Sequence, residues 1–294
     1  MRRLALLAFL CAVVGGACGG SVADGAVRLP LRVACFADGD AGPLVRADGQ
    51  LVRLSGASMT TEGPAPACPF TSSGRELFAG GQSVAAPVAP VVNTHGWAVD
   101  PLYLYHVRVE YLSPNYELWL YRGPRSGTAQ TKWVRLNEHV DPASAERAAE
   151  QVVLSTESYL LVGLNWVYVV PKAGGSPVRH ALPGRVESMA ALDVDTFVWT
   201  SQQAHDGSRG GVFRTSLGTG STVRIAEGPA TRVRVNDGLV YFLRDVRSLV
   251  AVQPSGAAER VLATSSGEDP IIDYLPAGAW LYWASGVTLT VVPR

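Results

Sequence analysis

The sequence has no excess of charge of either sign. Its 294 residues include 25 Lys and Arg against 25 Asp and Glu, and charged residues make up 17%, whereas an average soluble domain has about 25%. Hydrophobic residues make up 47%. This balance argues against a disordered chain, which needs low hydrophobicity and high net charge. It also argues against a nucleic-acid partner, because no basic excess is available to neutralise phosphates.

The sequence also lacks the common catalytic motifs: it has no G-x-S-x-G, no G-x-x-x-x-G-K-[ST] and no H-E-x-x-H. Its five histidines lie singly along the chain. His106 and His180 fall on predicted strands, where a structural imidazole is commoner than a metal ligand or a base. We therefore expect no cofactor and no metal site, and no residue is predicted to be catalytic.

An apolar run long enough to span a bilayer is missing as well. Leu4–Val14 has only eleven apolar residues, and a span needs about 20. This run follows Arg2 and Arg3 and leads through small residues into Cys18, which is the layout of an export signal. We interpret residues 1–18 as a signal peptide that ends in a lipobox-like sequence, and residues 19–26 as a flexible tether.

The expected location follows from this segment. The thiol of Cys18 would carry a lipid and hold the mature protein on a membrane of the bacterial cell envelope, with no other membrane contact. The lipobox pattern prefers Leu or Val three residues before the cysteine, where this chain has Gly15. Cleavage after Ala23 is the alternative, and it would give a soluble periplasmic or secreted protein.

Cysteine is scarce, with four residues in the chain. Cys11 leaves with the signal and Cys18 carries the lipid, so Cys35 and Cys68 remain as a pair. An even remainder in an oxidising compartment predicts one disulfide. Two buried free thiols are the alternative, and neither cysteine has a His or Cys at the spacing of a metal site.

The chain is rich in turn residues, with 31 Gly and 19 Pro. It also contains a repeated pattern. An acid, or in the last copy a glycine, is followed at the second and fourth positions by large apolar residues. Successive copies are separated by 57, 38, 42 and 41 residues, and three of these four intervals fall near the 40–45 of a four-stranded propeller blade. The anchor residues are Asp100, Glu157, Asp195, Asp237 and Gly278.

The repeat predicts an all-β fold: one β-propeller domain over residues 27–294, with four antiparallel strands per blade. Residues 36–92 hold a degenerate unit, so six blades are expected, or seven if that stretch contains two. The last unit has three strands where its neighbours have four. We therefore expect Val27–Ala34 to pair beside Thr288–Val292 and join both chain ends in one blade.

The 57-residue interval contains an insertion with helical character. Residues 141–150 (DPASAERAAE) place an N-cap acid before Pro142 at the first helical position, and helix formers follow. One short surface helix is expected there, between two blades.

Two tetrapeptides link the units to a known group. Phe197–Thr200 (FVWT) and Trp280–Trp283 (WLYW), each followed by a second strand, resemble degenerate blades of YWTD-type propellers. The units are also similar to those of bacterial exported propeller lipoproteins. The likeness covers roughly residues 95–294 and implies the propeller fold.

The repeated acids Asp100, Glu157, Asp195 and Asp237 could form a ring that holds a cation. We favour turn chemistry instead, because Asp at a strand entry accepts a hydrogen bond from the backbone two residues on. The start of a calcium loop at 38–42 lacks the later ligands. Four tryptophans that could stack on a carbohydrate are predicted as core between blades: Trp119, Trp166, Trp199 and Trp283.

Two function classes remain. The first is a monomeric, non-catalytic binding or scaffold propeller that offers its loop face to a protein, a peptide or a glycan. The second is an enzyme, such as a lyase or hydrolase of envelope or extracellular polymers, with its site at the channel mouth. The missing motifs favour the first class.

Overall fold

The computed structural model describes the chain in segments from residue 26 to the C-terminus. The described residues are 26–30, 33–37, 44–47, 50–64, 71–73, 76–79, 82–85, 91–100, 102–112, 115–124, 130–140, 152–163, 165–265 and 269–294. The expected signal peptide with Cys18, the tether up to residue 25, Cys68 and the expected helix over 141–150 lie outside these ranges. Within them, all regular structure is β-strand, and no helix long and apolar enough to cross a membrane occurs.

The strands form small antiparallel sheets, taken here in chain order. Two sheets cover the N-terminal region: β2 (Val33–Ala37), β3 (Leu44–Ala47), β4 (Gln50–Ser55) and β5 (Ser58–Pro64), then β6 (Thr71–Ser73), β7 (Glu76–Ala79) and β8 (Gln82–Ala85). Two more cover the middle: β9 (Val91–Val99), β10 (Tyr103–Leu112), β11 (Asn115–Pro124) and β12 (Thr131–Val140), then β13 (Val152–Ser155), β14 (Tyr159–Gly163), β15 (Trp166–Pro171) and β16 (Val178–Ala181).

Three sheets complete the chain. They are β17 (Ser188–Ala191), β18 (Thr196–Gln203), β19 (Arg209–Ser216) and β20 (Thr222–Glu227); β21 (Ala230–Asn236), β22 (Leu239–Arg244), β23 (Ser248–Val252) and β24 (Arg260–Thr264); and β25 (Ile271–Ala277), β26 (Trp280–Ser285) and β27 (Thr288–Pro293) with β1 (Val27–Pro30). The stretch 36–92 therefore contributes to two sheets, the arrangement on which the seven-unit alternative depends.

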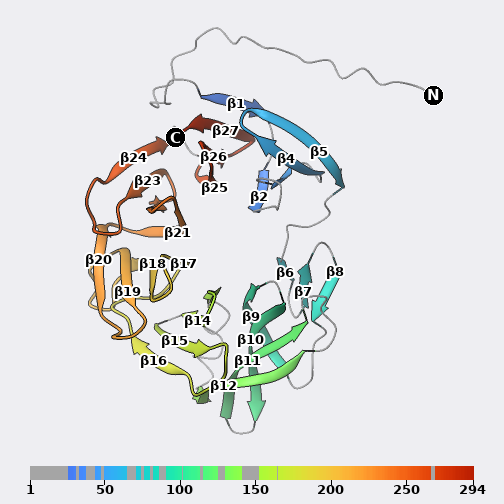
Figure 1. Cartoon of the computed structure of the whole chain (residues 1–294), viewed down its shortest axis with the longest axis vertical. Helices are drawn as coiled ribbons and strands as arrows, with labels where there is room; N and C mark the ends of the chain where they lie inside the picture. The colour runs from blue at the N-terminus through green and yellow to red at the C-terminus, as the bar shows by residue number, and fades with distance from the viewer. Residues whose placement is uncertain are drawn as a thin grey trace, which may run out of the picture.

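The sheets lie around a common centre, each with its first strand inward and its last strand at the rim (Figure 1). Contacts between inner strands run from β9 to β13, β17, β21, β25 and β2 in succession. The predicted repeat is thus confirmed as an all-β, propeller-like arrangement of four-stranded units.

Both faces of the middle strands are buried where a sheet packs between two others. In β22, Val240, Tyr241, Phe242 and Leu243 are all fully buried. Separate apolar clusters fill the junctions on the two faces: Val240 and Phe242 pack toward β18 and β19, and Tyr241 and Leu243 pack toward β25 and β26. This burial on both faces explains why successive residues of the second strands are all apolar instead of alternating between apolar and polar.

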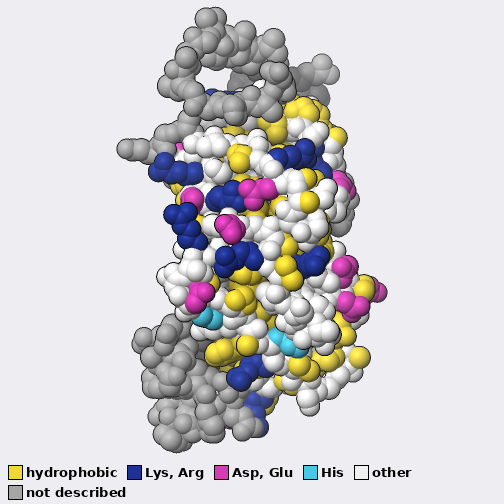
Figure 2. Space-filling model, turned by 90° about the vertical axis from the view of Figure 1, so that its left-hand side faces the viewer, with side chains coloured by type: hydrophobic (Ala, Val, Ile, Leu, Met, Phe, Trp, Pro, Cys, Tyr) yellow, Lys and Arg dark blue, Asp and Glu magenta, His cyan; other side chains and the backbone are white. Residues whose placement is uncertain are grey.

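Arginines of the outermost strands β16 and β20 cover aromatic rings of the neighbouring strand, and Arg244 covers a ring of its own strand, β22. The guanidinium of Arg179 lies 5.6 Å from the ring centre of Trp166, that of Arg224 lies 5.3 Å from Phe213, and that of Arg244 lies 5.4 Å from Phe242. Such contacts are favourable and cover apolar surface with a charged side chain. Basic, acidic and hydrophobic side chains are interspersed on the described part of the rim that faces the viewer in Figure 2.

The expected pairing of the two chain ends is present. β1 pairs with β27 in antiparallel register, with Val27 opposite Val291 and Pro30 opposite Thr288. The expectation is wrong for the end of the segment, because Val33 and Ala34 belong to β2 in the next sheet. Pro30 has no N–H with which to extend the ladder, so the strand that closes the last sheet ends there.

Candidate functional site

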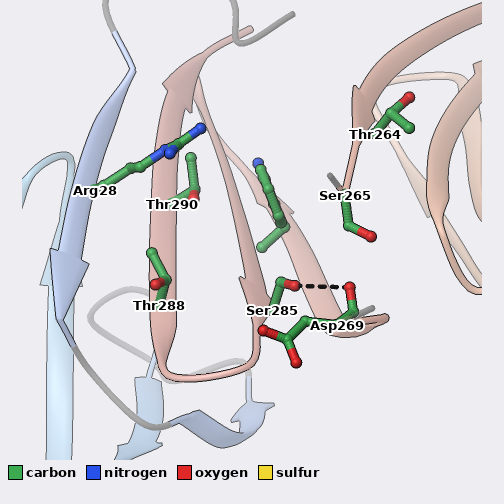
Figure 3. Close-up of a pocket in the computed structure, with 8 residues that line it drawn as sticks. Arg28, Thr264, Ser265, Asp269, Ser285, Thr288 and Thr290 are labelled. Atoms are coloured by element: carbon green, nitrogen blue, oxygen red, sulfur yellow. Dashed lines mark hydrogen bonds between the residues drawn. The ribbon is translucent and has the colours of Figure 1, made fainter. Parts of the chain in front are cut away.

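A small polar pocket lies at the junction between the sheet β21–β24 and the sheet that β1 completes (Figure 3). Its volume is about 140 Å³. The walls come from β1, β24, β26 and β27, together with Ser265 and Asp269 between β24 and β25. The lining residues are Arg28, Thr264, Ser265, Asp269, Trp283, Ser285, Thr288 and Thr290.

The antiparallel ladder brings three of these residues into one row. Arg28 pairs with Thr290, and Thr290 pairs with Trp283, so the three side chains emerge side by side from three adjacent strands. Side chains alternate along β27, where Thr290 lies on the pocket face and its neighbours Leu289 and Val291 pack into the opposite core. In Figure 3, Arg28 reaches across β27 toward the centre of the pocket.

The opposite wall is held by backbone contacts. The N–H of Ser265 donates to the carbonyl of Arg247 at 2.8 Å, and the hydroxyl of Ser285 donates to the carbonyl of Asp269 at 3.1 Å. Gly286 has a φ of +54°, and a Cβ there would lie 2.7 Å from the Asp269 carboxylate. A glycine is therefore required for the β26–β27 turn to approach Asp269 closely.

Two polar atoms of this pocket have no hydrogen-bond partner among the described residues. They are the indole N–H of Trp283, a residue 7% exposed, and the hydroxyl of Ser265, a residue 8% exposed. A buried polar group without a partner costs about 1–3 kcal/mol. Native structures contain few such groups, and each is a place where a ligand or a water can bind.

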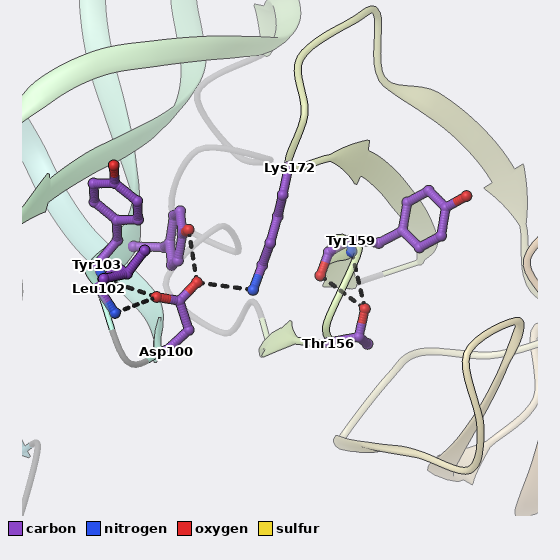
Figure 4. A network of polar contacts seen from close by, with 7 residues as sticks. Asp100, Leu102, Tyr103, Thr156, Tyr159 and Lys172 are labelled. Carbon is purple, nitrogen blue, oxygen red and sulfur yellow. Dashed lines mark hydrogen bonds and ion pairs between the residues drawn. The ribbon is translucent and has the colours of Figure 1, made fainter.

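A second polar site, at the junction between the sheets β9–β12 and β13–β16, is fully partnered (Figure 4). The Asp100 carboxylate accepts hydrogen bonds from the N–H groups of Leu102 (2.9 Å) and Tyr103 (2.8 Å). It also accepts from the Tyr105 hydroxyl and from Lys172 Nζ, both at 2.8 Å. Lys172 follows β15, so this ion pair joins two sheets.

The pKa of Asp100 reflects this set of donors. Burial acts to raise the pKa, but the bonds from Lys172, the two backbone N–H groups and Tyr105 outweigh burial and lower it from 3.8 to about 2. Burial and the contact with Asp100 raise the pKa of Tyr105 above its usual range. Asp100 stays ionised and serves to join the two sheets.

Asp100 has the turn role that was predicted for the repeated acids. In two other units a residue that precedes the acid has that role. Thr156 accepts from the N–H of Tyr159 at 3.0 Å, and Asp193 accepts from the N–H of Asp195 at 2.9 Å. The neighbouring Glu157 is exposed. The expectation therefore placed the turn acceptor one residue late in one unit and two residues late in the other, because it aligned each acid by the apolar residues that follow.

Asp237 differs again. It adopts a positive φ of 47° at the β21–β22 turn, and its carboxylate lies 2.7 Å from the Arg294 guanidinium. The four acids belong to different sheets. Across the part of the chain that the structure describes, no group of three His, Cys, Asp or Glu side chains could hold a metal ion.

Titratable groups also converge on the inner strands β21 and β25. Asp273, 9% exposed, lies 3.6 Å from the guanidinium of Arg232 and 3.5 Å from that of Arg234. Arg232 has a φ of +53° in a bulge, and its carbonyl accepts from the hydroxyl of Tyr274. Because arginine does not deprotonate in proteins, these ion pairs offer no acid–base partner to the carboxylate.

His106 has a structural environment, as expected. Its side chain is fully buried in β10, where it stacks on Tyr121 with ring centres 5.3 Å apart and accepts a hydrogen bond from Arg108 Nε. Burial, with a smaller contribution from the Arg108 charge, lowers the pKa of His106 from 6.5 to about 3. The imidazole is therefore neutral at physiological pH.

The predicted modification sites stay predictions. Cys35 lies in β2, and Cys18 and Cys68 fall outside the described residues. The pocket itself was not predicted, because the expected pairing of residues 27–34 with 288–292 carried no register that would bring Arg28 opposite Thr290. Trp283 lies in an inter-sheet core as expected, and it also lines the pocket.

No protein-family model and no curated protein matches the chain. Among solved structures, the computationally designed Ika8 protein matches with a TM-score of 0.53 and 11% identity, over 90% of this chain and 97% of the designed one. The extracellular domain of the hybrid two-component system BT4673 from B. thetaiotaomicron matches with a TM-score of 0.52 and 12% identity, over 89% of this chain and 38% of that one. At this identity the likeness shows the fold alone, and the chain has the fold of these propeller-like structures.

Proposed function

We propose that the protein is a non-catalytic binding propeller of seven blades, anchored to the bacterial cell envelope. Six sheets follow one another through contacts between their inner strands, and the seventh, β6–β8, lies between the first and third sheets in the chain. The pairing of β1 with β27 closes the last blade. Monomeric repeats of this kind need no partner to bury their edges.

The observation that carries the binding function is the pocket of Figure 3. It combines hydroxyls, one guanidinium and one carboxylate, and two of its buried polar atoms have no partner among the described residues. Such a set of groups can bind a polar ligand, and the Ser285 hydroxyl donates to the backbone carbonyl of Asp269 rather than to a carboxylate that could act as a base. The partner is a protein, a peptide or a glycan of the envelope.

The anchor in this proposal is the lipid on Cys18. The eight residues 19–26 separate it from β1 and span at most about 29 Å. Because β1 also carries Arg28, the tether would keep the pocket within that reach of the membrane surface. Labelling with a palmitate analogue tests the anchor: the wild type should be labelled and Cys18→Ser should not, and equal labelling of both would refute it.

The disulfide between Cys35 and Cys68 belongs to the same proposal. Cys35 lies in the inner strand β2, and Cys68 falls between β5 and β6. A bridge would therefore tie the first sheet to the chain that enters the next. It would stabilise the fold by roughly 3–4 kcal/mol. Mass spectrometry of non-reduced peptides should find the two cysteines linked, whereas two alkylatable thiols in the mature protein would exclude the bridge.

Incubation with isolated envelope polymers separates binding from catalysis. A binding propeller should sediment with a polymer and leave its length unchanged. Release of soluble fragments, abolished by Asp273→Asn, would instead support a lyase or hydrolase that acts at the inner strands. Failure of the purified chain to associate with any envelope fraction would contradict the binding function.

A further inference from the structure

We infer that the pocket of Figure 3 holds a neutral, polyhydroxylated unit, a single sugar residue of a glycan. This inference rests on the proposed binding function and names its ligand class. The hydrogen-bonding character of the walls, their charge balance, their unpartnered atoms and their size each support it.

Hydroxyl groups dominate the walls. Five of the eight lining residues carry one, and a hydroxyl both donates and accepts a hydrogen bond. An anion presents only acceptors and an ammonium group only donors, so neither uses such a surface fully. A sugar presents hydroxyls of its own, which can accept from a wall hydroxyl or donate to it. The five residues are Thr264, Ser265, Ser285, Thr288 and Thr290.

The two charges of the pocket balance each other. Arg28 contributes a guanidinium on one side and Asp269 a carboxylate on the other. A phosphate bound between them would be attracted by Arg28 and repelled by Asp269, and a cation would meet the reverse. A neutral ligand can accept a hydrogen bond from Arg28 and donate one to Asp269 at the same time. Both bonds are charge-assisted, which is the stronger kind.

The unpartnered atoms point to the same ligand. The indole N–H of Trp283 is a donor only, so it needs an acceptor, and the Ser265 hydroxyl can take either partner. The ring oxygen and hydroxyls of a sugar supply both.

The volume limits how much of the ligand is enclosed. About 140 Å³ corresponds to the liquid volume of roughly four or five waters, which is less than a whole hexose occupies, so one edge of a sugar ring enters the pocket. Pockets for drug-sized molecules measure about 300–1,000 Å³. The site therefore suits the end of a glycan chain or one projecting residue, with the rest of the chain outside.

Ligand binding should also strengthen the closing strand. Arg28 belongs to β1, whereas Thr290, Trp283 and Ser265 belong to strands near the C-terminus or the linker that precedes them. A ligand bonded to both sides connects β1 to the rest of the blade through contacts other than the β1–β27 ladder. Binding is thus coupled to the joining of the two chain ends.

The test is an NMR titration of the full chain with a neutral hexose, a neutral N-acetylhexosamine and inorganic phosphate. The chain has seven tryptophans, and the indole signal missing from Trp283→Phe assigns Trp283. We expect a neutral sugar to shift this signal and to slow amide exchange in β1. Arg28→Gln should weaken that sugar about tenfold, the usual loss for one charge-assisted bond.

The matched controls are Trp166→Phe and Arg179→Gln, the same residue types in contact with each other in another sheet. Both should leave the sugar affinity unchanged, and thermal melts establish that every variant is folded. A larger shift with phosphate, a shift with no probe, or equal affinity in Arg28→Gln and Arg179→Gln would overturn the inference. If Arg28→Gln retains the wild-type association with envelope polymers, the proposed binding function is still supported, and only the assignment of this ligand to this pocket is wrong.

Discussion

Two junctions between neighbouring sheets differ in whether their polar groups have hydrogen-bond partners. Where the sheet β9–β12 meets β13–β16, the Asp100 carboxylate has four hydrogen-bond donors, and one of them, Lys172, comes from the other sheet. Where the sheet β21–β24 meets the sheet that β1 completes, the Trp283 N–H and the Ser265 hydroxyl have no partner among the described residues. The first junction is complete as it stands, and the second contains a pocket.

The difference teaches how to separate structural from functional polar groups in a repeat fold. Both junctions bury aromatic residues, and both include a charged side chain, so burial and charge do not distinguish them. Hydrogen-bond satisfaction does. A group whose partners are all supplied by the chain stabilises the fold, whereas a group left without one has capacity for a ligand.

The largest expected effect comes from removal of β1, which breaks the second junction and also the core that Leu29 shares with the sheet β2–β5. A chain that starts at residue 27 should melt like the wild type. A chain that starts at residue 31 should lose about 3–5 kcal/mol, from the exposure of Leu29 and the lost ladder bonds, and melt roughly 5–10 °C lower. Hydrogen exchange should accelerate in β27 and not in β10. Equal melting temperatures would show that β1 does not support the blade.

Asp100→Asn should weaken the first junction by about 1–2 kcal/mol at pH 7, because the amide cannot form the charge-assisted bond to Lys172. The contribution of Asp100 is present above its unfolded pKa near 4, since its folded pKa is lowered to about 2. The stability difference between wild type and variant should therefore shrink as the pH falls from 4 to 2.

Denaturant melts across that range measure the difference. Asp195→Asn is the control, because this exposed acid is one of the repeated set but its carboxylate is not the turn acceptor in its unit. A pH-independent loss in Asp100→Asn would mean that the ion pair with Lys172 does not stabilise the junction.

A matched pair of tryptophans isolates hydrogen-bond satisfaction itself. Trp199 donates its N–H to Thr215 at 2.9 Å, whereas the N–H of Trp283 has no partner among the described residues. Replacement by Phe removes the same volume at both positions. Trp199→Phe should therefore cost about 1 kcal/mol more than Trp283→Phe in the absence of ligand. Equal costs would indicate that the Trp283 N–H is satisfied, for example by a bound water.

The smallest expected effect on stability comes from a second matched pair, Ser188 and Ser265. Ser188 bonds to the Thr200 hydroxyl and accepts from the N–H of Val233, both at 2.7 Å, so Ser188→Ala should destabilise the protein by about 1 kcal/mol. Ser265→Ala removes a hydroxyl with no partner among the described residues and should leave the free energy of unfolding within about 0.5 kcal/mol of the wild type. A loss at Ser265 equal to that at Ser188 would contradict the comparison.

The architecture was predictable because each unit repeats the same local physics. The apolar second strands, the turn residues between them and the three-stranded last unit predicted stacked sheets and the pairing of Val27–Ala34 with the last strand, of which Val27–Pro30 pairs. The alignment of the acids was less accurate. Leu102, one of the apolar residues on which the alignment of the repeat was based, is 70% exposed, and the strand begins at Tyr103. A period-two pattern tolerates a shift of one residue where a loop leucine precedes the strand.

The pocket could not be predicted, for a different reason. Arg28 and Asp269 lie near opposite ends of the chain, and neither belongs to a motif. Their proximity depends on the register of β1 on β27 and on the φ of +54° at Gly286, which lets the turn approach Asp269. Unpaired polar atoms become visible only once every neighbour is placed, so hydrogen-bond satisfaction is a property that sequence patterns do not carry.

The pairing of β1 with β27 has a consequence for the order in which the protein matures. Among the described strands, β1 leaves the ribosome first, and its partner, Thr288–Pro293, leaves last. The intervening sheets can form from local hairpins as the chain lengthens, but β1 has to wait for the whole chain. The pocket, which needs Arg28 from β1, is therefore the last part to form. A chain truncated before Thr288 lacks Thr288 and Thr290 of the pocket and the strand that pairs with β1, so it would not bind ligand.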